Sequence, residues 1–172
     1  MKSLKIGDKV IYPNQGLGVV EAIHEEAYNG ERFTVFNLRI ISNNTLVTLP
    51  SSTAVELGIR RPMTEESIRK FFQFMGNGGV DVTADWKGRY KEHLSLMKSG
   101  TLLDMATVLK SLYYLSLQKP LSFREKKMME KAKELIISEI SEAVALAPEK
   151  IEEKLLSTLA RSFKAAKTRV AA

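Results

Sequence analysis

Along the first 50 residues, apolar and polar positions alternate with the short period of β-strands. An apolar run at 10–12 and strand-like segments at 19–23 and 45–49 are separated by Gly, Pro and Asn, and residues 35–40 alternate one by one. Such alternation places successive side chains on opposite faces of a sheet. The pattern predicts four or five short strands in a small, strongly bent sheet or barrel, since about 50 residues are too few for a large sandwich.

Asn29-Gly30 is the clearest turn signal in the chain. Both central residues of a type I′ turn need positive φ, which asparagine and glycine tolerate best. We therefore expect a tight hairpin at this point. Residues 13–16 and 43–44 predict further turns between the strands.

From residue 64 onward, apolar residues recur every three or four positions, which is the period of an amphipathic helix. Three helices are predicted over about 64–75, 85–100 and 101–119. A fourth begins at Ser122, which has the spacing of a capping box with Glu125, and a fifth begins at Pro148. We expect the basic segment 164–169 to fray.

The change of period near residues 57–63 divides the chain, because Gly58 and Pro62 interrupt both patterns. The predicted fold class is α+β with two domains. A β domain occupies residues 1–60, and a compact bundle of about five α-helices occupies residues 63–172.

The net charge of +6 is concentrated in the helical part. Residues 1–75 hold nine Lys and Arg against eight Asp and Glu, whereas residues 76–172 hold 17 against 12. A basic domain is typical of proteins that bind a polyanion, most often nucleic acid. The same charge fits a well-solvated helical surface equally well.

The sequence has no cysteine, which excludes disulfides and thiolate metal sites. The N-terminus lacks the apolar run of a secretory signal, and no stretch is apolar enough for a membrane helix. We therefore expect a cytoplasmic protein that has no membrane partner.

The common catalytic motifs do not occur in this sequence. The two histidines, His24 and His93, have no HExxH context, and neither GxSxG nor GxxxxGK[ST] is found. Residues 16–18 lack the third glycine that a dinucleotide site needs. We expect a protein that is not an enzyme and that carries no cofactor and no metal.

Residues 85–91, DWKGRYK, hold the single tryptophan and three cations near a predicted helix start. Cations there can contact phosphates, and a large ring at the same edge can wedge into a base step. Alternatively, the tryptophan packs against the bundle core, and the composition alone favours this second interpretation. The helical period places Trp86, Tyr90, Leu94 and Met97 on one face.

Three segments of the chain resemble the CarD/CdnL family of bacterial RNA-polymerase-binding transcription regulators. They are GDKVIYP with GLGVV at 7–20, WKGRYK at 86–91 and LSFREKKM at 121–128, and they stand in the family's order with similar spacing. The first resembles the opening of the RNA-polymerase-interacting domain, which also occurs in the transcription-repair coupling factor. This chain has no helicase motif, which excludes the coupling factor itself.

The resemblance implies a Tudor-like β domain that binds the polymerase β subunit, and a helical domain on promoter DNA at the upstream edge of the transcription bubble. Trp86 would insert into the minor groove near the −10 element without reading sequence, and would thereby stabilise the open complex. Lys87, Arg89 and Lys91 would contact phosphates. We expect a monomer that reaches the nucleoid through the polymerase.

Two positions depart from the family pattern. Gly88 stands where relatives often have arginine, and the neighbouring Lys87 can replace that charge. In the β domain, Glu26 and Thr48 stand where some relatives have cations, whereas Pro50 matches. The resemblance therefore implies Glu26, Thr48 and Pro50 as the polymerase-facing positions.

Two other functions are compatible with this sequence. A Tudor- or KOW-like module that binds RNA or DNA without polymerase would be retained on nucleic acid, with affinity that falls steeply with salt. A structural scaffold whose basic helices bind an acidic protein would unfold when Trp86 is replaced by alanine.

Overall fold

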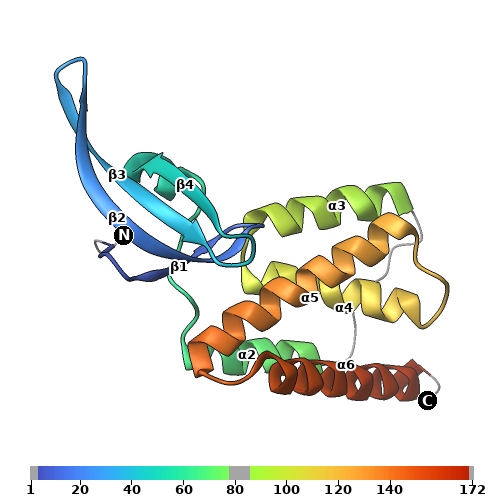
Figure 1. The fold of residues 1–172 in the computed structure, drawn as a ribbon. Coiled ribbons are helices and arrows are strands. Elements are labelled where there is room, and N and C mark those ends of the chain that lie inside the picture. The colour runs from blue at the N-terminus through green and yellow to red at the C-terminus, as the bar shows by residue number, and fades with distance from the viewer. Residues whose placement is uncertain (1–3, 78–85, 171–172) are drawn as a thin grey trace. The chain divides into compact units, whose positions relative to one another are not determined.

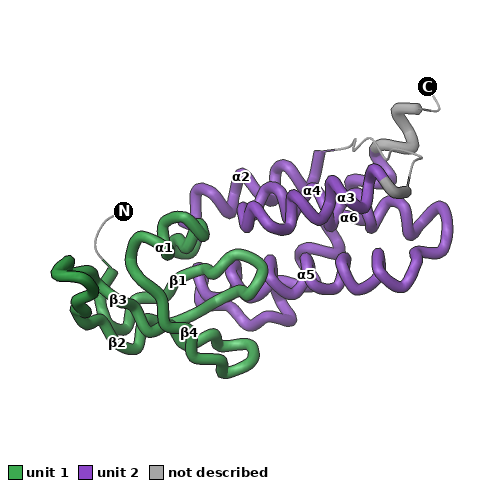
Figure 2. The backbone as a smooth tube through the Cα atoms, turned by 90° about the horizontal axis from the view of Figure 1, so that it is seen from above, with its two compact units in different colours: residues 1–62 green, residues 63–172 purple. Residues whose placement is uncertain are grey.

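The computed structural model describes residues 4–77 and 86–170, apart from the side chains of residues 86–87 and 166–170. The chain separates into two compact units, residues 1–62 and residues 63–172 (Figure 2). Each unit has its own hydrophobic core. The fold is α+β, as predicted, with a curled sheet followed by a bundle of helices (Figure 1).

The first unit is a four-stranded antiparallel sheet in the order β1-β2-β3-β4. Its strands are β1 (Lys9–Tyr12), β2 (Gly16–Tyr28), β3 (Glu31–Ile40) and β4 (Thr45–Pro50), and a short helix, α1 (Ser51–Glu56), follows. After α1 the chain returns to the free edge of β1. There the Ile11 N–H donates to the Arg60 carbonyl at 2.7 Å and the Arg60 N–H donates back at 3.2 Å, which partly closes the curl.

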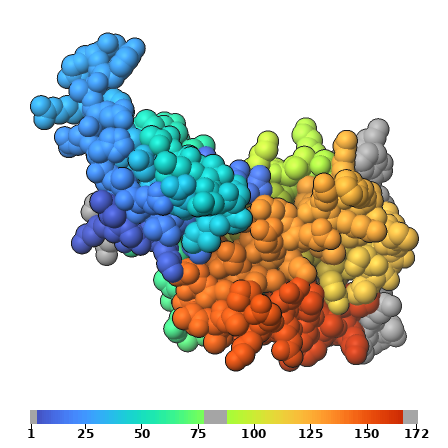
Figure 3. Space-filling view, viewed as in Figure 1, coloured from blue at the N-terminus to red at the C-terminus, as the bar shows by residue number. Residues whose placement is uncertain are grey.

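The long β2–β3 hairpin extends well beyond β1 and β4 (Figures 1 and 3). At its tip Asn29 and Gly30 have φ values of 50° and 83°, so the predicted hairpin turn is confirmed. Nearer the base, the register of β2 against β3 shifts between Val20 and Ala22. This bulge at Glu21 bends the strand and contributes to the curl.

The core of the β unit lies on one face of the sheet, as the alternation predicts. The buried side chains on this face include Phe36 and Leu38 of β3, and Ala54 of α1 covers them. Gly18 stands where a side chain would be tightly crowded, because a Cβ there would meet the Arg39 carbonyl at 3.3 Å. Packing space therefore accounts for one glycine of the pair at 16 and 18.

The second unit contains five helices in its described residues. They are α2 (Glu65–Gly76), α3 (Trp86–Ser99), α4 (Leu102–Ser116), α5 (Phe123–Val144) and α6 (Pro148–Val170). Side-chain hydroxyls of Thr64, Thr101 and Ser122 cap α2, α4 and α5. α4 is buried along most of its length, which makes it the central helix of the bundle.

Helix α6 runs to Val170, and Phe163 packs edge-on against Tyr114 at 5.1 Å between ring centroids. One expectation about these helices was wrong, because a different face of α3 is buried. Leu94 is exposed, whereas the polar Arg89 and His93 are buried together with Met97.

A buried lysine fixes the C-terminal end of α2. The Lys110 side chain, on α4, is only 1% exposed, and its Nζ donates to the carbonyl of Phe74 at 2.9 Å and to that of Asn77. The Ser162 hydroxyl donates to the same Asn77 carbonyl at 2.9 Å and bonds the Tyr114 hydroxyl. Because burial disfavours the charged amine, it lowers the pKa of Lys110.

Candidate functional site

The first turns of α3 and α5 lie side by side at one end of the helical unit (Figure 1). They are joined by an ion pair in which Arg89 Nη2 lies 2.8 Å from Glu125 Oε1. The two side chains are 3% and 11% exposed, so the pair is shielded from water. A shielded pair of this kind holds two elements in one arrangement, because separating them would leave both charges unpaired.

Glu125 also completes the capping box of α5. Its Oε2 accepts the Ser122 N–H at 2.9 Å and the Ser122 hydroxyl at 2.7 Å, while the Ser122 hydroxyl oxygen accepts the Glu125 N–H at 3.3 Å. Burial by itself would raise the pKa of Glu125, but the hydrogen bonds from Arg89 and Ser122 outweigh it and lower the pKa to about 2. The carboxylate is therefore charged at neutral pH.

The structure corrects the expected role of Arg89. A phosphate contact needs an exposed guanidinium, whereas the Arg89 side chain is buried and paired with Glu125. Lys91, two residues further along α3, is exposed and fits the expected role. Trp86 and Lys87 are the first two residues of α3, and their side chains lie outside the described residues.

His93 lies one turn beyond Arg89 on the buried face of α3. Its pKa is lowered mainly because burial disfavours the imidazolium, and the Arg89 charge acts in the same direction, although Glu92 and Glu125 oppose it. The ring is therefore neutral at physiological pH. This packing could not be predicted from the sequence, since polar residues on a charged helix are usually solvated.

The start of α5 presents an aromatic ring and several cations to solvent. Phe123, the first residue of the helix, is 71% exposed, and the Lys127 Nζ lies 4.7 Å from its ring centroid. Arg124 and Lys126 are also exposed. This end of the helical unit therefore carries the exposed Lys91 on α3 and a basic first turn on α5.

In the β unit, the three candidate polymerase-facing residues share one face of the sheet. Thr48 and Pro50 are two residues apart on β4, and Pro50 is opposite Val35 of β3, which is opposite His24 of β2. Glu26 follows His24 by two residues on the same strand. Because paired residues and residues two apart point to the same side, this face is opposite to the core.

Hydrogen bonds fix the side chains of this outer face. The Thr48 hydroxyl donates to Asn37 Oδ1 at 3.0 Å, and Glu26 Oε1 lies 3.0 Å from His24 Nε2. Both pairs are exposed, so each contributes little to stability.

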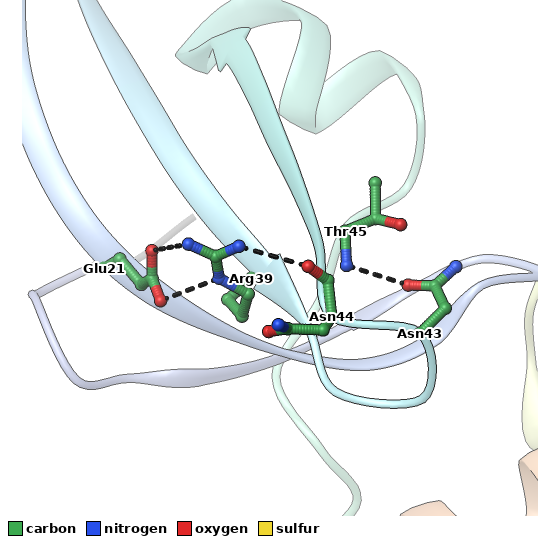
Figure 4. Close-up of polar contacts among 5 residues, drawn as sticks. All are labelled: Glu21, Arg39, Asn43, Asn44 and Thr45. Carbon is green, nitrogen blue, oxygen red and sulfur yellow. Dashed lines mark hydrogen bonds and ion pairs between the residues drawn. The ribbon is translucent and has the colours of Figure 1, made fainter.

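The same face holds a two-pronged ion pair (Figure 4). Arg39 Nε and Nη2 donate to the two carboxylate oxygens of Glu21 at 2.9 Å each, and Nη1 donates to the Asn44 carbonyl at 3.1 Å. The Asn43 side chain accepts the Thr45 N–H at 3.1 Å. Hydrogen bonding to Arg39 lowers the pKa of Glu21. These contacts tie the β3–β4 turn to the bulge of β2.

Comparison with known proteins matches both units of the chain. Residues 4–63 match the family model described as CarD-like/TRCF RID domain, and residues 70–156 match CarD, C-terminal domain. The chain belongs to the CarD family. The sequence resemblance to this family is thereby confirmed across nearly the whole chain.

Two CarD-family relatives illustrate the match. The putative transcription factor YdeB of Bacillus subtilis (strain 168) is 32% identical over 137 residues, which cover 79% of this chain and 89% of that protein. The solution NMR structure of the 72-residue N-terminal domain of Myxococcus xanthus CarD is 32% identical and covers 34% of this chain and 79% of that one, with a TM-score of 0.30.

Within residues 4–77 and 86–170, no group of three or more His, Asp or Glu side chains is placed to hold a metal ion. In the same part of the chain, none of the helices combines the length and apolar character needed to span a bilayer.

Proposed function

We propose that this CarD-family chain is a transcription regulator that binds the RNA polymerase β subunit through its β unit and stabilises the promoter open complex through its helical unit. In this proposal, Trp86 inserts at the upstream edge of the transcription bubble. The match of both units to CarD-family models, in the family's order, supports the regulatory role.

The observation that carries the proposal is the buried Arg89–Glu125 ion pair. Trp86 begins the helical turn that contains Arg89, so the pair holds the start of the helix to which Trp86 belongs. An inserted side chain binds more favourably when the helix that carries it is already ordered, because ordering a mobile segment on insertion costs conformational entropy. Arg89 thus acts as a positioning residue for the wedge.

The surrounding charge fits a contact with duplex DNA. Lys91 is exposed on the same helix as Trp86, and Arg124 and Lys126 are exposed on the neighbouring first turn of α5. Cations of this kind bind phosphates irrespective of base sequence. Sequence readout by this unit is not needed, since the polymerase places it on the promoter.

The mechanism is a shift between two states of the promoter. A wedge that contacts the edge of melted DNA more favourably than closed duplex stabilises the open state by the difference between the two binding free energies. Equal binding to both states would change nothing. The expected effect is therefore a longer open-complex lifetime.

The β unit would bind the polymerase and thereby bring the helical unit to the promoter. β4 is an edge strand with only β3 beside it in the sheet, and its outer face carries Leu46, Thr48 and Pro50. Leu46 and Thr48 are exposed. An edge strand can accept a strand or loop of another protein through its outward backbone N–H and C=O groups, and exposed side chains add specificity. Glu26, two strands away on the same face, would add a charged contact.

Open-complex decay on a polymerase–promoter complex, measured with the full chain and a competitor, tests the wedge. We expect Trp86→Ala to keep the helical circular dichroism and to shorten the lifetime about five- to tenfold, as loss of an intercalating side chain implies. Trp86→Phe, which keeps a ring, should lose less. An unchanged lifetime with an intact fold would exclude this role.

Co-purification with polymerase tests whether the β unit binds the polymerase. We expect Thr48→Asp to reduce capture of polymerase, whereas Trp86→Ala and the control Val55→Asp, at an exposed position of α1, leave capture unchanged. The opposite pattern, in which only helical-unit variants lose polymerase, would reverse the assignment of the two units.

A further inference from the structure

We propose that the groove between α2 and α6 binds an acidic, amphipathic helix of a protein in the polymerase–promoter complex. The inference rests on the proposed function, which brings the helical unit into that complex. It assigns a role to two helices that take no part in the candidate DNA contacts. In Figure 1 these two helices lie along the lower side of the helical unit, whereas α3 lies along its upper side.

The groove is formed by side chains that recur along the two neighbouring helices. Its volume is about 620 Å³. On α6 the lining residues extend from Lys154 to Ala165, over a length of roughly 16 Å, or about three helical turns. On α2 they extend from Ile68 to Gly76. The groove is therefore long enough to hold a short helix that lies along α2 and α6.

Apolar groups form the floor of the groove. Ile68 is buried, and Phe72 is half-buried against the core of the helical unit. Gly76 leaves space at one end, because a Cβ at this position would meet only the Thr158 methyl, at the ordinary contact distance of 3.7 Å. A larger side chain at position 76 would therefore fit beside Thr158 and fill part of the groove.

The charged groups along the groove are all basic. Arg69 on α2 and Lys154 and Arg161 on α6 line it, and no acid is found among the described residues that do so. Lys154 Nζ lies 4.3 Å from the Phe72 ring centroid, which holds this cation above the apolar floor. Within the described part of the chain, none of the three cations is in an ion pair. The groove is therefore complementary to a row of carboxylates.

An acidic helix fits this groove better than duplex DNA does. Packed helices have axes about 8–10 Å apart, and a helix with its side chains is about 10–12 Å across, so a third helix can reach the floor between them. Its apolar stripe would cover Phe72, and Asp or Glu on either side would meet Arg69 and Arg161. A duplex is wider, so its phosphates would meet the cations at the rims and leave the apolar floor uncovered.

Photo-crosslinking in the full chain tests the inference. Benzoylphenylalanine replaces Gln73, an exposed residue of the groove, in the open complex of purified polymerase holoenzyme on a labelled promoter. We expect a crosslink to a protein subunit, in a segment where Asp and Glu outnumber Lys and Arg. The control carries the same group at Leu156, a 39% exposed position of α6 outside the groove. A crosslink to DNA or to a segment without an excess of acids, or a yield no higher than that from position 156, would overturn the proposal.

Substitutions in the groove separate the effect of charge from that of shape. We expect Arg161→Glu to lower the crosslink yield from position 73 about fivefold, since repulsion replaces an exposed ion pair, and Arg161→Lys to lose less. Lys150→Glu makes the same change of charge on α6 outside the groove and should leave the yield unchanged. Gly76→Leu should lower the yield at constant charge, and circular dichroism checks each fold. Equal yields in Arg161→Glu and Lys150→Glu, or a full yield in a folded Gly76→Leu protein, would contradict the proposal.

Failure of this inference can be distinguished from failure of the proposed function. If Trp86→Ala shortens the open-complex lifetime and position 73 gives no specific protein crosslink, only the present inference fails. If Trp86→Ala leaves the lifetime unchanged while position 73 crosslinks to an acidic segment, the wedge fails and the contact in the groove stands.

Discussion

The guanidinium of Arg89 and the carboxylate of Glu125 meet at 2.8 Å inside the helical unit. The two residues are 36 positions apart, and their contact joins the first turns of α3 and α5. Each charge is tolerated there only because the other is present. The arrangement at this end of the bundle therefore depends on a pair of side chains whose types alone suggest solvent exposure.

Removing one member of this pair should be costly. We expect Arg89→Met to lower the free energy of unfolding by about 3–5 kcal/mol, because Glu125 would remain buried and unpaired. The double variant Arg89→Met/Glu125→Gln should regain most of this loss, since glutamine keeps the capping box and carries no charge. Urea unfolding measures all variants. The surface control Lys91→Met should change little, and an Arg89→Met effect no larger than this control would contradict the expectation.

The same pair predicts how stability depends on pH. The pKa of Glu125 is lowered from 4.5 to about 2 in the folded chain. Between these two values the unfolded chain binds a proton that the folded chain does not, so stability falls as the pH falls from 4.5 toward 2. Urea midpoints over this range should drop less in Arg89→Met/Glu125→Gln than in the wild type. Parallel curves for the two proteins would rule out this contribution.

Lys110 should contribute to stability through the end of α2. Lys110→Met keeps the length and apolar stem of the side chain, but leaves the part-buried Phe74 carbonyl without this donor. We expect a loss of about 1–3 kcal/mol in the free energy of unfolding. Ser162→Ala should cost less, because Lys110 still serves the Asn77 carbonyl. A loss no greater than that of Lys98→Met, at an exposed lysine of α3, would speak against this role.

Lys91 should act on DNA through charge alone. We expect Lys91→Ala to weaken promoter-complex retention and to reduce the slope of log affinity against log salt by about 1, as loss of one phosphate contact implies. Lys98→Ala, at the other end of the same helix, should leave the slope unchanged. Tight, salt-sensitive binding to free duplex without polymerase would instead favour a module that acts on nucleic acid alone.

The features that the sequence predicted correctly depend on residues close together in the chain. The Asn29-Gly30 turn, the capping box at Ser122 and the alternation along β3 each have their cause within a few positions. Local chemistry of this kind leaves a direct signature in sequence. The number of strands and the number of helices after the boundary follow from it.

The features that the sequence missed depend on distant partners. Arg89 was assigned to a phosphate from its place in the WKGRYK motif, and its partner Glu125 is 36 residues away, with nothing in either segment to indicate the contact. The buried Lys110 amine is paired with carbonyls at the C-terminal end of α2, 33 and 36 residues earlier. The helix α1 was missed because its six residues are too few to show a helical period.

The paired hydrogen bonds between Ile11 and Arg60 determine where a fragment that contains the β unit can end. A fragment that stops at Leu57 would omit both this tie and the buried Ile59, and would leave the edge of β1 bare. A fragment that continues through Pro62 retains both. The last residues before the helical unit are therefore part of the β unit's own structure, and any graft of that unit onto another protein has to carry them along.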